Sequence, residues 1–530
     1  MKAFHIDMNV AQFRRSYLEQ WLRHLARLGY DTILWEVENN IHWQTVQCAA
    51  PEAFTPDEFR EILALCRSLG LESIPLLQVL AHCEYVLQLP QYRHLSELPD
   101  RISQYCPLHP ELSPLLLRWI DEYLEIFGPV KAFHLGGDES WWLGSCPRCK
   151  EYVGQHSLGD LYLQHVNPLL TALIERGIQP ALWADMILSH PRIIDQLPRQ
   201  VLMFDWMYDI YRGSGKVWVW GERIMCDRDQ IPPARLATYH RHLFPHGDEP
   251  GREPETFYTA DFLKDNGFDV VTCPGASHYQ DNVFIGRTYL NLVNTFDSWH
   301  KGMTLNGSLL TSWTVHLHPW ELQLPAIELA PWINRHPNET LEAFQRDFTH
   351  RHFGLDDNRF WRAAGLLAKP VLFSTMHTLG HDKTCPQVPL TYLLDTLQKR
   401  DKEGHLDTDL DNARQRLIEY RQAHGLFVQL ALSAQCGLEL LERYNLAARN
   451  LIHRAQALIH LITSHRGHAE GNASELLSDL LSLRAETDKI YERMQKPSRR
   501  ARILSTLYAP LEHALRNPPP RASTGTANVR

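Results

Sequence analysis

The stretch that decides the fold is KAFHLGGDE, residues 131–139. An apolar run of strand length ends in two glycines, and two adjacent carboxylates, Asp138 and Glu139, follow at once. Two tryptophans, Trp141 and Trp142, come directly after them. In parallel α/β folds, the loops at the C-terminal ends of the strands carry the chemistry. This segment therefore predicts both a buried strand and a functional site at its end.

The same pattern recurs on both sides of this segment. Helix-like segments such as residues 14–29, which end at Gly29, and residues 55–70, which begin with Thr55 as a cap, separate the strand-like runs. The strand-like runs are residues 2–8, 32–38, 72–79, 132–139, 180–186, 201–208, 269–275 and 307–313. Eight such units predict an α/β fold, a (β/α)8 TIM barrel over residues 1–337. The alternative is an open doubly wound sheet, which is disfavoured because no GxGxxG turn follows the first strand.

Long connections and a change of composition complete the organisation. Loops of unusual length follow the second, third and sixth strand-like runs, at residues 39–54, 80–110 and 209–254. Such loops are usually functional in a compact domain. After Pro337 the strand signals stop, which predicts an all-α helical C-terminal domain over residues 338–515. The Pro- and Ser/Thr-rich tail, residues 516–530, is predicted to be disordered.

Composition excludes several classes of protein. The 530 residues are 44% apolar and 22% charged, as in ordinary globular proteins of two or three domains. A net charge of −9 argues against nucleic acid as a partner. No apolar run approaches the ~20 residues of a membrane span, and no secretory signal is evident. A cytoplasmic protein with reduced thiols is therefore expected.

The ten cysteines include one CxxC pair, Cys146 and Cys149. The pair lacks an obvious second CxxC or HxxxH partner in the sequence. It would become a zinc site if Cys48, Cys83 or Cys106 lay nearby in space. Two free thiols in a loop are the favoured interpretation, so neither a metal nor a cofactor is predicted.

The strand ends predict a site for a polar ring-shaped ligand. Because consecutive strand residues point to opposite sides, Asp138 and Glu139 are expected to have different roles. Gly136 and Gly137 suit close approach or unusual backbone angles just before them. Other strand ends deliver tryptophans to the same rim, namely Trp183, Trp206 and Trp313. Aromatic faces around a carboxylate pair suit a pyranose, whose C–H faces stack on rings and whose hydroxyls take polar neighbours.

Residues 134–139, HLGGDE, resemble the H-x-G-G-D-E signature of glycoside hydrolase family 20, the β-N-acetylhexosaminidases. The resemblance extends over most of residues 1–335. Residues 74–97 and 133–149 are especially similar to the small hexosaminidase D-type branch, which lacks the usual N-terminal domain of the family. This chain likewise begins directly at its first strand.

The resemblance implies an exo-acting hydrolase that removes terminal β-linked GlcNAc or GalNAc from an oligosaccharide or glycoconjugate. In the family, the 2-acetamido oxygen of the substrate attacks the anomeric carbon, and an oxazolinium intermediate forms with retention of configuration. By that pattern Asp138 orients the acetamide N–H, whereas Glu139 protonates the leaving oxygen and then activates water. This mechanism is an exception to the rule of two protein carboxylates, and it needs no cofactor.

Further residues carry over from the family pattern as substrate-binding candidates. The tryptophans at 183, 206 and 313 match pocket-lining positions, and His134 is expected to support the acids through hydrogen bonds. A tyrosine that bonds the acetamide oxygen corresponds to Tyr208 or Tyr279, with Asp281 accompanying the latter. Glu321 is expected to bind a sugar hydroxyl.

One departure from the family pattern concerns the first strand. Many family members carry Asp-x-x-Arg after this strand, but here Asp7 is followed at that spacing by Val10. Asp7, Glu36 and Glu38 are candidates to replace the missing arginine in binding hydroxyls. The substrate therefore stays open between GlcNAc, GalNAc and a deacetylated glucosaminide.

Two other functions remain compatible with the sequence. A β-glycosidase or exo-β-glucosaminidase could use two protein carboxylates, with Glu36 or Asp281 as the second. A non-catalytic carbohydrate-binding barrel is the other alternative. The helical domain is a candidate brace for the barrel, a wall of the cleft or a surface for homodimer formation.

Overall fold

The structure is a computed structural model that describes residues 1–208, 215–222, 224–277, 288–314, 317–372 and 389–518. Tyr279 and Asp281 lie outside these residues. None of the described helices is both long enough and apolar enough to cross a membrane.

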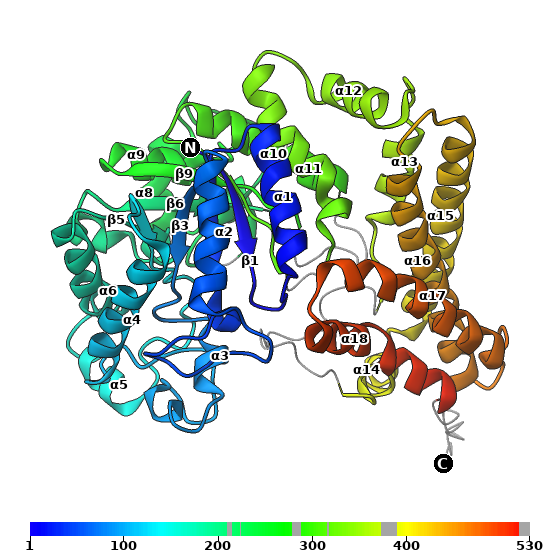
Figure 1. Ribbon diagram of the computed structural model, residues 1–530, viewed down its shortest axis with the longest axis horizontal. Helices are drawn as coiled ribbons and strands as arrows, with labels where there is room; N and C mark the ends of the chain where they lie inside the picture. The colour runs from blue at the N-terminus through cyan, green and yellow to red at the C-terminus, as the bar shows by residue number, and fades with distance from the viewer. Residues whose placement is uncertain (209–214, 223, 278–287, 315–316, 373–388, 519–530) are drawn as a thin grey trace.

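Eight parallel strands close into a barrel, which confirms the predicted fold class (Figure 1). Each barrel strand pairs with the next barrel strand along the chain, and the last one pairs with the first. The barrel strands in order are β1 (Lys2–Asp7), β2 (Thr32–Glu36), β3 (Glu72–Leu76), β4 (Ala132–His134), β5 (Gln179–Trp183), β6 (Leu202–Trp206), β9 (Asp269–Cys273) and β10 (Ser308–Leu310).

Helices cover the outside of the barrel, and their ends follow local sequence signals. Helix α1 (Arg15–Leu28) ends at Gly29, whose φ of 106° is left-handed, as its C-cap. Helix α2 (Pro56–Ser68) begins with a capping box between Thr55 and Glu58. The other helices of the barrel and its loops are α3 (Glu84–Leu87), α4 (Leu112–Phe127), α5 (Pro147–Val153), α6 (Leu158–Glu175), α7 (Asp185–Ser189), α9 (Tyr258–Asp265), α10 (Thr288–Met303) and α11 (Trp320–Arg335).

The strand register places the functional candidates at one level of the barrel. Asp7 pairs with Glu36, Glu36 with Leu76, and Leu76 with His134. Since these residues end their strands, the loops that follow all leave from the same face. The barrel interior below is filled by a separate apolar cluster that includes Leu34, Phe204 and Trp183.

Strand β4 is shorter than the sequence predicts. It pairs as a strand only over Ala132–His134, whereas a run through Glu139 was expected. Gly136 and Gly137 have φ angles of 60° and 82°, which an extended strand does not allow. Asp138 and Glu139 therefore stand in the loop after β4 and not in the strand.

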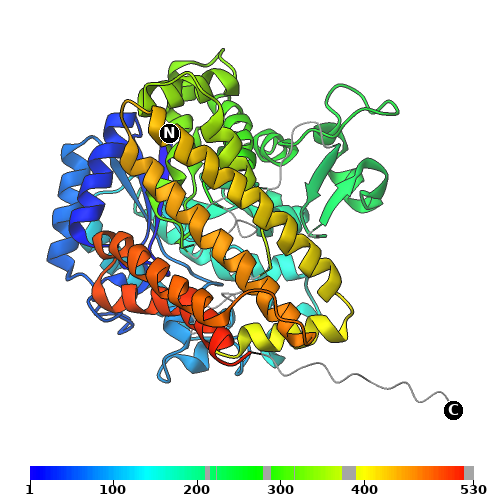
Figure 2. The same cartoon turned by 90° about the vertical axis from the view of Figure 1, so that its right-hand side faces the viewer.

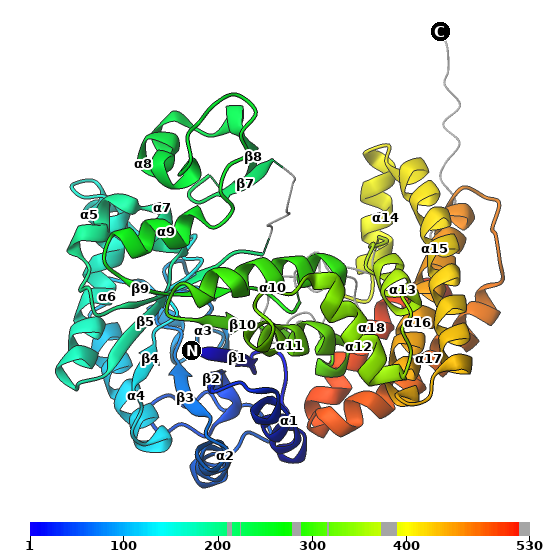
Figure 3. The same ribbon diagram turned by 90° about the horizontal axis from the view of Figure 1, so that it is seen from above.

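The long connection after β6 has structure of its own, which the sequence analysis missed. It contains an antiparallel hairpin, β7 (Lys216–Val219) and β8 (Ile224–Asp227), followed by α8 (Pro233–Leu243). Figure 3 shows the hairpin and α8 projecting beyond the barrel. Val217 and Val219 are buried and alternate with more exposed residues, which is the period-two pattern of a half-buried strand.

The C-terminal region is helical throughout the described part of residues 338–518, as predicted. Helices α15 and α16 run side by side as a hairpin (Figure 2). The helices of this region are α12 (Leu341–Phe353), α13 (Arg359–Leu367), α14 (Tyr392–Lys402), α15 (Leu406–Ser433), α16 (Leu438–His465), α17 (Ala473–Met494) and α18 (Pro497–Arg516).

The helical region docks on loops at the C-terminal face of the barrel. The backbone of Gln12, after β1, donates to Gln495 Oε1 at 2.7 Å and accepts from the backbone N–H of Lys496 at 2.7 Å. The Tyr444 hydroxyl donates to the carbonyl of Leu322 in α11 at 3.0 Å. These bonds hold the helical region beside the rim that carries the acids.

Candidate active site

The two glycines in the turn after β4 lie close to the side chains of Gln78 and Tyr162. A Cβ at Gly136 would lie 2.0 Å from Gln78 Oε1, and one at Gly137 would lie 2.7 Å from the Tyr162 hydroxyl. The Gly136 N–H donates to His134 Nδ1 at 2.9 Å, so the proton of a neutral His134 is on Nε2. The two glycines thus leave room for the side chains of Gln78 and Tyr162. Their positive φ angles also form the turn that ends in Asp138 and Glu139.

His82, in the loop after β3, joins the two acids. Its Nε2 lies 3.1 Å from Asp138 Oδ2 and 3.3 Å from Glu139 Oε2. The expectation that the two acids point to opposite sides is therefore wrong, because both leave a turn and converge on one imidazole. His82 and Glu139 both have positive φ angles, 59° and 46°, which are uncommon for residues other than glycine and cluster at functional sites.

The two acids nevertheless differ in environment. The Asp138 side chain is 8% exposed, whereas the Glu139 side chain is 36% exposed. The two carboxyl groups therefore differ in their access to solvent and to a ligand, which suits different roles for the two acids.

Asp185, the first residue of α7, supports the pair from the C-terminal end of β5. Its Oδ2 accepts the Glu139 N–H at 3.0 Å, and the side chain is buried. Burial, followed by the charge of Asp138, raises the pKa of Asp185 well above its usual value. Asp185 therefore orients the backbone of Glu139. With its raised pKa, the Asp185 carboxyl group tends to keep its proton.

The three predicted tryptophans come together as one aromatic wall. The ring centroid of Trp183 lies 4.5 Å from that of His134 and 5.9 Å from that of Trp313. Trp313 Nε1 donates to the Tyr208 hydroxyl at 2.9 Å, and Trp206 stacks on the Tyr208 ring at 5.3 Å. The sequence prediction that these strand ends share one rim is confirmed.

Several buried polar atoms in this cluster have no hydrogen-bond partner among the described residues. They include Asp138 Oδ1, His134 Nε2 and Trp183 Nε1. Burial lowers the pKa of His134 to about 3, so its ring is neutral and Nε2–H is a donor. Buried unpaired groups are rare in folded proteins and require a reason, such as a ligand or ordered water. One acceptor and two donors are thus available to a polar ligand.

Asp7 and Glu36 lie at the level of the site but are fully buried and engaged with protein. Asp7 accepts the N–H groups of Asn9 and Thr314, both at 2.8 Å. Glu36 Oε1 accepts from Gln78 Nε2 at 2.9 Å, and its Oε2 lies 3.1 Å from His5 Nε2. Both carboxylates therefore brace the floor of the site.

Glu321, at the start of α11, faces the helical region. It accepts from the Tyr17 hydroxyl at 3.0 Å, and its Oε1 lies 3.6 Å from an Arg443 guanidinium nitrogen. Its predicted contact with a sugar hydroxyl stays a prediction. The predicted contacts of Tyr279 and Asp281 also stay predictions, since neither residue is described.

The CxxC pair has a spatial partner. Cys106 Sγ lies 3.6 Å from both Cys146 Sγ and Cys149 Sγ, and Glu97 completes the group. A hydrogen bond with Cys149 lowers the pKa of Cys106 to about 7. Of the three partners considered from sequence, Cys106 is the one in this group; Cys83 donates its thiol to the Ala81 carbonyl.

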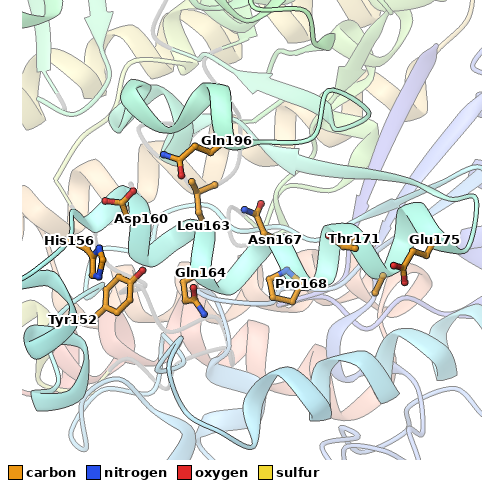
Figure 4. Close-up of a pocket in the computed structure, with 11 residues that line it drawn as sticks. Tyr152, His156, Asp160, Leu163, Gln164, Asn167, Pro168, Thr171, Glu175 and Gln196 are labelled. Atoms are coloured by element: carbon orange, nitrogen blue, oxygen red, sulfur yellow. The ribbon is translucent and has the colours of Figure 1, made fainter.

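A groove of about 580 Å³ lies elsewhere, along the solvent side of α6 (Figure 4). Its walls come from α5, α6 and the 3₁₀ turn Pro191–Gln196. It is lined by Tyr152, His156, Asp160, Leu163, Gln164, Asn167, Pro168, Thr171, Ala172, Glu175 and Gln196. None of these residues belongs to the strand-end cluster.

Sequence reasoning missed two residues of the cluster, His82 and Asp185. His82 lies 56 residues before Asp138 in the chain, and no local pattern connects the two. Asp185 carried a usable signal, because it follows Trp183 by two positions at a strand end.

Comparisons with known proteins agree with this arrangement. Residues 31–220 match the glycosyl hydrolase family 20 catalytic domain. Hexosaminidase D of Bos taurus is 29% identical over 244 residues, which cover 42% of this chain and 70% of the bovine protein. Hexosaminidase D of Homo sapiens is 30% identical over 203 residues, which cover 37% of this chain and 41% of the human protein.

Among solved structures, the chitobiase of Flavobacterium johnsoniae aligns with 97% of this chain and 78% of its own. The identity is 15% and the TM-score 0.47, a level that does not by itself establish a common fold. The barrel topology rests instead on the strand pairing described above.

The matched range includes the β4 loop with Asp138 and Glu139, the β3 loop with His82, and the start of α7 with Asp185. Residues 31–220 thus match the glycosyl hydrolase family 20 catalytic domain, and the chain resembles hexosaminidase D in sequence.

Proposed function

We propose that this protein removes terminal β-linked N-acetylhexosamine from glycans with retention of configuration, and that the acetamide of the substrate supplies the nucleophile. The observation that carries the proposal is the adjacent acid pair. One acid is buried with an unpartnered oxygen, and its neighbour is more exposed, inside a wall of tryptophans.

Asp138 is the clamp in this proposal. Its unpartnered Oδ1 accepts the acetamide N–H and turns the acetamide oxygen towards the anomeric carbon. As that oxygen bonds to the carbon and the glycosidic bond breaks, positive charge develops on the acetamide nitrogen. A fixed carboxylate stabilises this charge. Intramolecular attack has a high effective molarity, so no protein nucleophile is required.

Glu139 is the general acid and then the general base. It protonates the leaving glycosidic oxygen, and its carboxylate next takes a proton from the water that opens the oxazolinium ring. His82 lies within 3.3 Å of both acids, and Asp185 holds the Glu139 backbone. We assign these two residues to positioning.

The aromatic wall supports recognition of a sugar. Trp313, which is half-buried, offers a face for the pyranose ring or the acetamide methyl group, and the buried Trp183 packs beside it. Tyr208, whose hydroxyl accepts from Trp313 Nε1, can direct its own O–H to the acetamide oxygen. Trp206 stacks on Tyr208 and keeps that ring in place.

The two-carboxylate alternative loses one of its candidates on geometry. Glu36 is fully buried, and both of its oxygens already have partners within the protein. A nucleophile at that position would have to break both contacts before it could reach a sugar. The substrate-assisted mechanism needs only groups that the rim already presents.

The test compares three kinds of aryl β-glycoside and adds one inhibitor and an NMR measurement. We expect turnover of aryl β-GlcNAc or β-GalNAc glycosides, inhibition by a thiazoline mimic of the oxazolinium ion, and a first-formed β-anomer by NMR. Cleavage of aryl β-glucosides at a comparable rate, without thiazoline inhibition, would instead support the two-carboxylate mechanism. Binding of GlcNAc without turnover would support a non-catalytic barrel.

A further inference from the structure

Four side chains from two barrel loops meet in one buried group. Glu97 and Cys106 come from the connection between β3 and α4, and Cys146 and Cys149 come from the connection between β4 and α6. One ligand atom from each lies within 4.8 Å of every other. Glu97, Cys106 and Cys149 are buried, and Cys146 is half-buried.

The distances fit a metal site better than a disulfide. Cys106 Sγ lies 3.6 Å from both other sulfurs, whereas a disulfide needs about 2.05 Å. With Zn–S bonds of about 2.3 Å, tetrahedral geometry places sulfur atoms about 3.8 Å apart. Cys149 Sγ lies 3.4 Å from Glu97 Oε2, which is close to the sulfur–oxygen separation of the same geometry. Three of the six separations among the four atoms are thus close to those of a tetrahedral zinc site, and the other three do not exceed 4.8 Å.

Glu97 needs a positive partner. It is 1% exposed, and it forms no ion pair with Lys, Arg or His among the described residues. Its Oε1 accepts the N–H groups of Ser145 and Cys146 at 2.7 and 2.9 Å, which leaves Oε2 directed at the cysteines. A buried carboxylate beside three thiols is costly unless a cation balances the charge.

We propose that Glu97, Cys106, Cys146 and Cys149 bind one Zn²⁺ ion with structural function. Three sulfurs and one oxygen in a tetrahedral arrangement are a ligand set that zinc accepts and that magnesium and calcium do not. Four protein ligands leave no open position for substrate, which is the mark of a structural site. Backbone N–H bonds to Glu97, and one from Cys149 to Cys146 Sγ, orient the ligands.

The ion would join the two loops that carry the acid pair and its partner. The β3 loop carries His82, and the β4 loop carries Asp138 and Glu139. The hydrogen bonds that join the two loops without the metal include one from the Trp142 N–H to Gln104 Oε1 and those from Ser145 and Cys146 to Glu97. A zinc ion between them fixes the separation of His82 from the two acids.

The first experiment measures metal content in the full chain, purified in reducing buffer without chelator and supplied with zinc. Mass spectrometry of the metals should find about one zinc per chain. The Cys146→Ser/Cys149→Ser double variant should fall to less than about a tenth of that value. Cys436→Ser, at an exposed cysteine outside the group, is the matched control and should keep the full zinc content.

A second experiment tests the site without removing any cysteine, in case the double variant fails to fold. Glu97→Gln retains the three thiols and should release zinc to a chromogenic chelator at least about tenfold faster than wild type. Cobalt(II) added to the metal-free wild type should give thiolate-to-metal charge-transfer absorption and the intense visible bands of tetrahedral cobalt.

Three outcomes would overturn the proposal. They are folded wild type that holds no zinc after supplementation, cobalt spectra without thiolate ligation, and an intact mass that shows a disulfide among the three cysteines. These measurements read metal and not glycoside cleavage, so their outcome is independent of the proposed function.

Discussion

Charged groups at the rim of the barrel and charged pairs on the surface of the C-terminal helical region differ in burial. At the rim, Asp138 and Asp185 are buried, and Asp138 keeps an oxygen without a partner among the described residues. In the helical region, pairs such as Arg449 with Glu486 lie at the surface, where both side chains are 38% exposed. Exposed ion pairs change the free energy of unfolding little. Buried acids with incomplete pairing are typical of sites that bind a ligand or transfer a proton.

The largest effect should come from the acid of the rim. Glu139→Gln removes the proton donor and should lower kcat/KM for substrates with poor leaving groups by about 10²- to 10⁴-fold. Activated aryl glycosides should lose much less, because their leaving groups need no proton. Steady-state kinetics on both substrate types measure the difference, and Glu151→Gln, at an exposed acid in α5, is the matched control. Equal losses on both types would contradict the acid role.

A somewhat smaller effect should come from the clamp. Asp138→Asn keeps the size of the side chain but removes its charge, and should lower kcat by about 10²- to 10³-fold with a smaller change in KM. The loss falls mainly on kcat because the positive charge on the acetamide develops in the transition state and is absent from the bound substrate. A change confined to KM would mean that Asp138 binds the substrate without stabilising the transition state.

The next prediction concerns stability and pH. Asp205, in β6, is buried and accepts from the Thr259 hydroxyl at 2.8 Å, and burial raises its pKa to about 7 from 3.8. Between these values the folded state keeps a proton that the unfolded state has lost. Stability contributed by this group is therefore present below pH ~4 and falls as pH rises towards 7.

The measurement is the free energy of unfolding of wild type and Asp205→Asn at pH 5 and pH 7. Wild type should lose about 2 kcal/mol more than the variant over this range, since one pKa unit corresponds to about 1.4 kcal/mol. The exposed aspartate variant Asp195→Asn should follow wild type. Parallel curves for wild type and Asp205→Asn would show that Asp205 does not titrate there.

The smallest effect should come from the helical region. Glu486→Gln removes the partner of Arg449 at the surface and should lower the free energy of unfolding by less than about 1 kcal/mol. The pair is exposed and forms no part of the rim, so kcat/KM should stay unchanged. A loss of activity would mean that the helical region controls the site, and would break the contrast between the two regions.

Much of the fold could be predicted because its signals are local. Alternation of apolar residues, the cap at Gly29 and the capping box at Thr55 are each contained within a few residues. The tryptophans at the strand ends could be placed on one rim because strands of a barrel end at a common face. The hairpin β7–β8 was missed because its short alternating strands lie inside a segment rich in Gly and Pro.

The sequence by itself determined the barrel, the helical C-terminal region and the acid pair with its tryptophans, because periodicity, caps and a compact motif depend on near neighbours in the chain. Only the tertiary structure decided that Asp138 and Glu139 converge on His82, that Asp185 holds the Glu139 backbone, and that Glu97 and Cys106 complete the CxxC group. These contacts join residues 40 to 57 positions apart. No local sequence pattern predicts such pairs. Closure of the barrel determines the distances between them, and burial determines how their polar groups are paired.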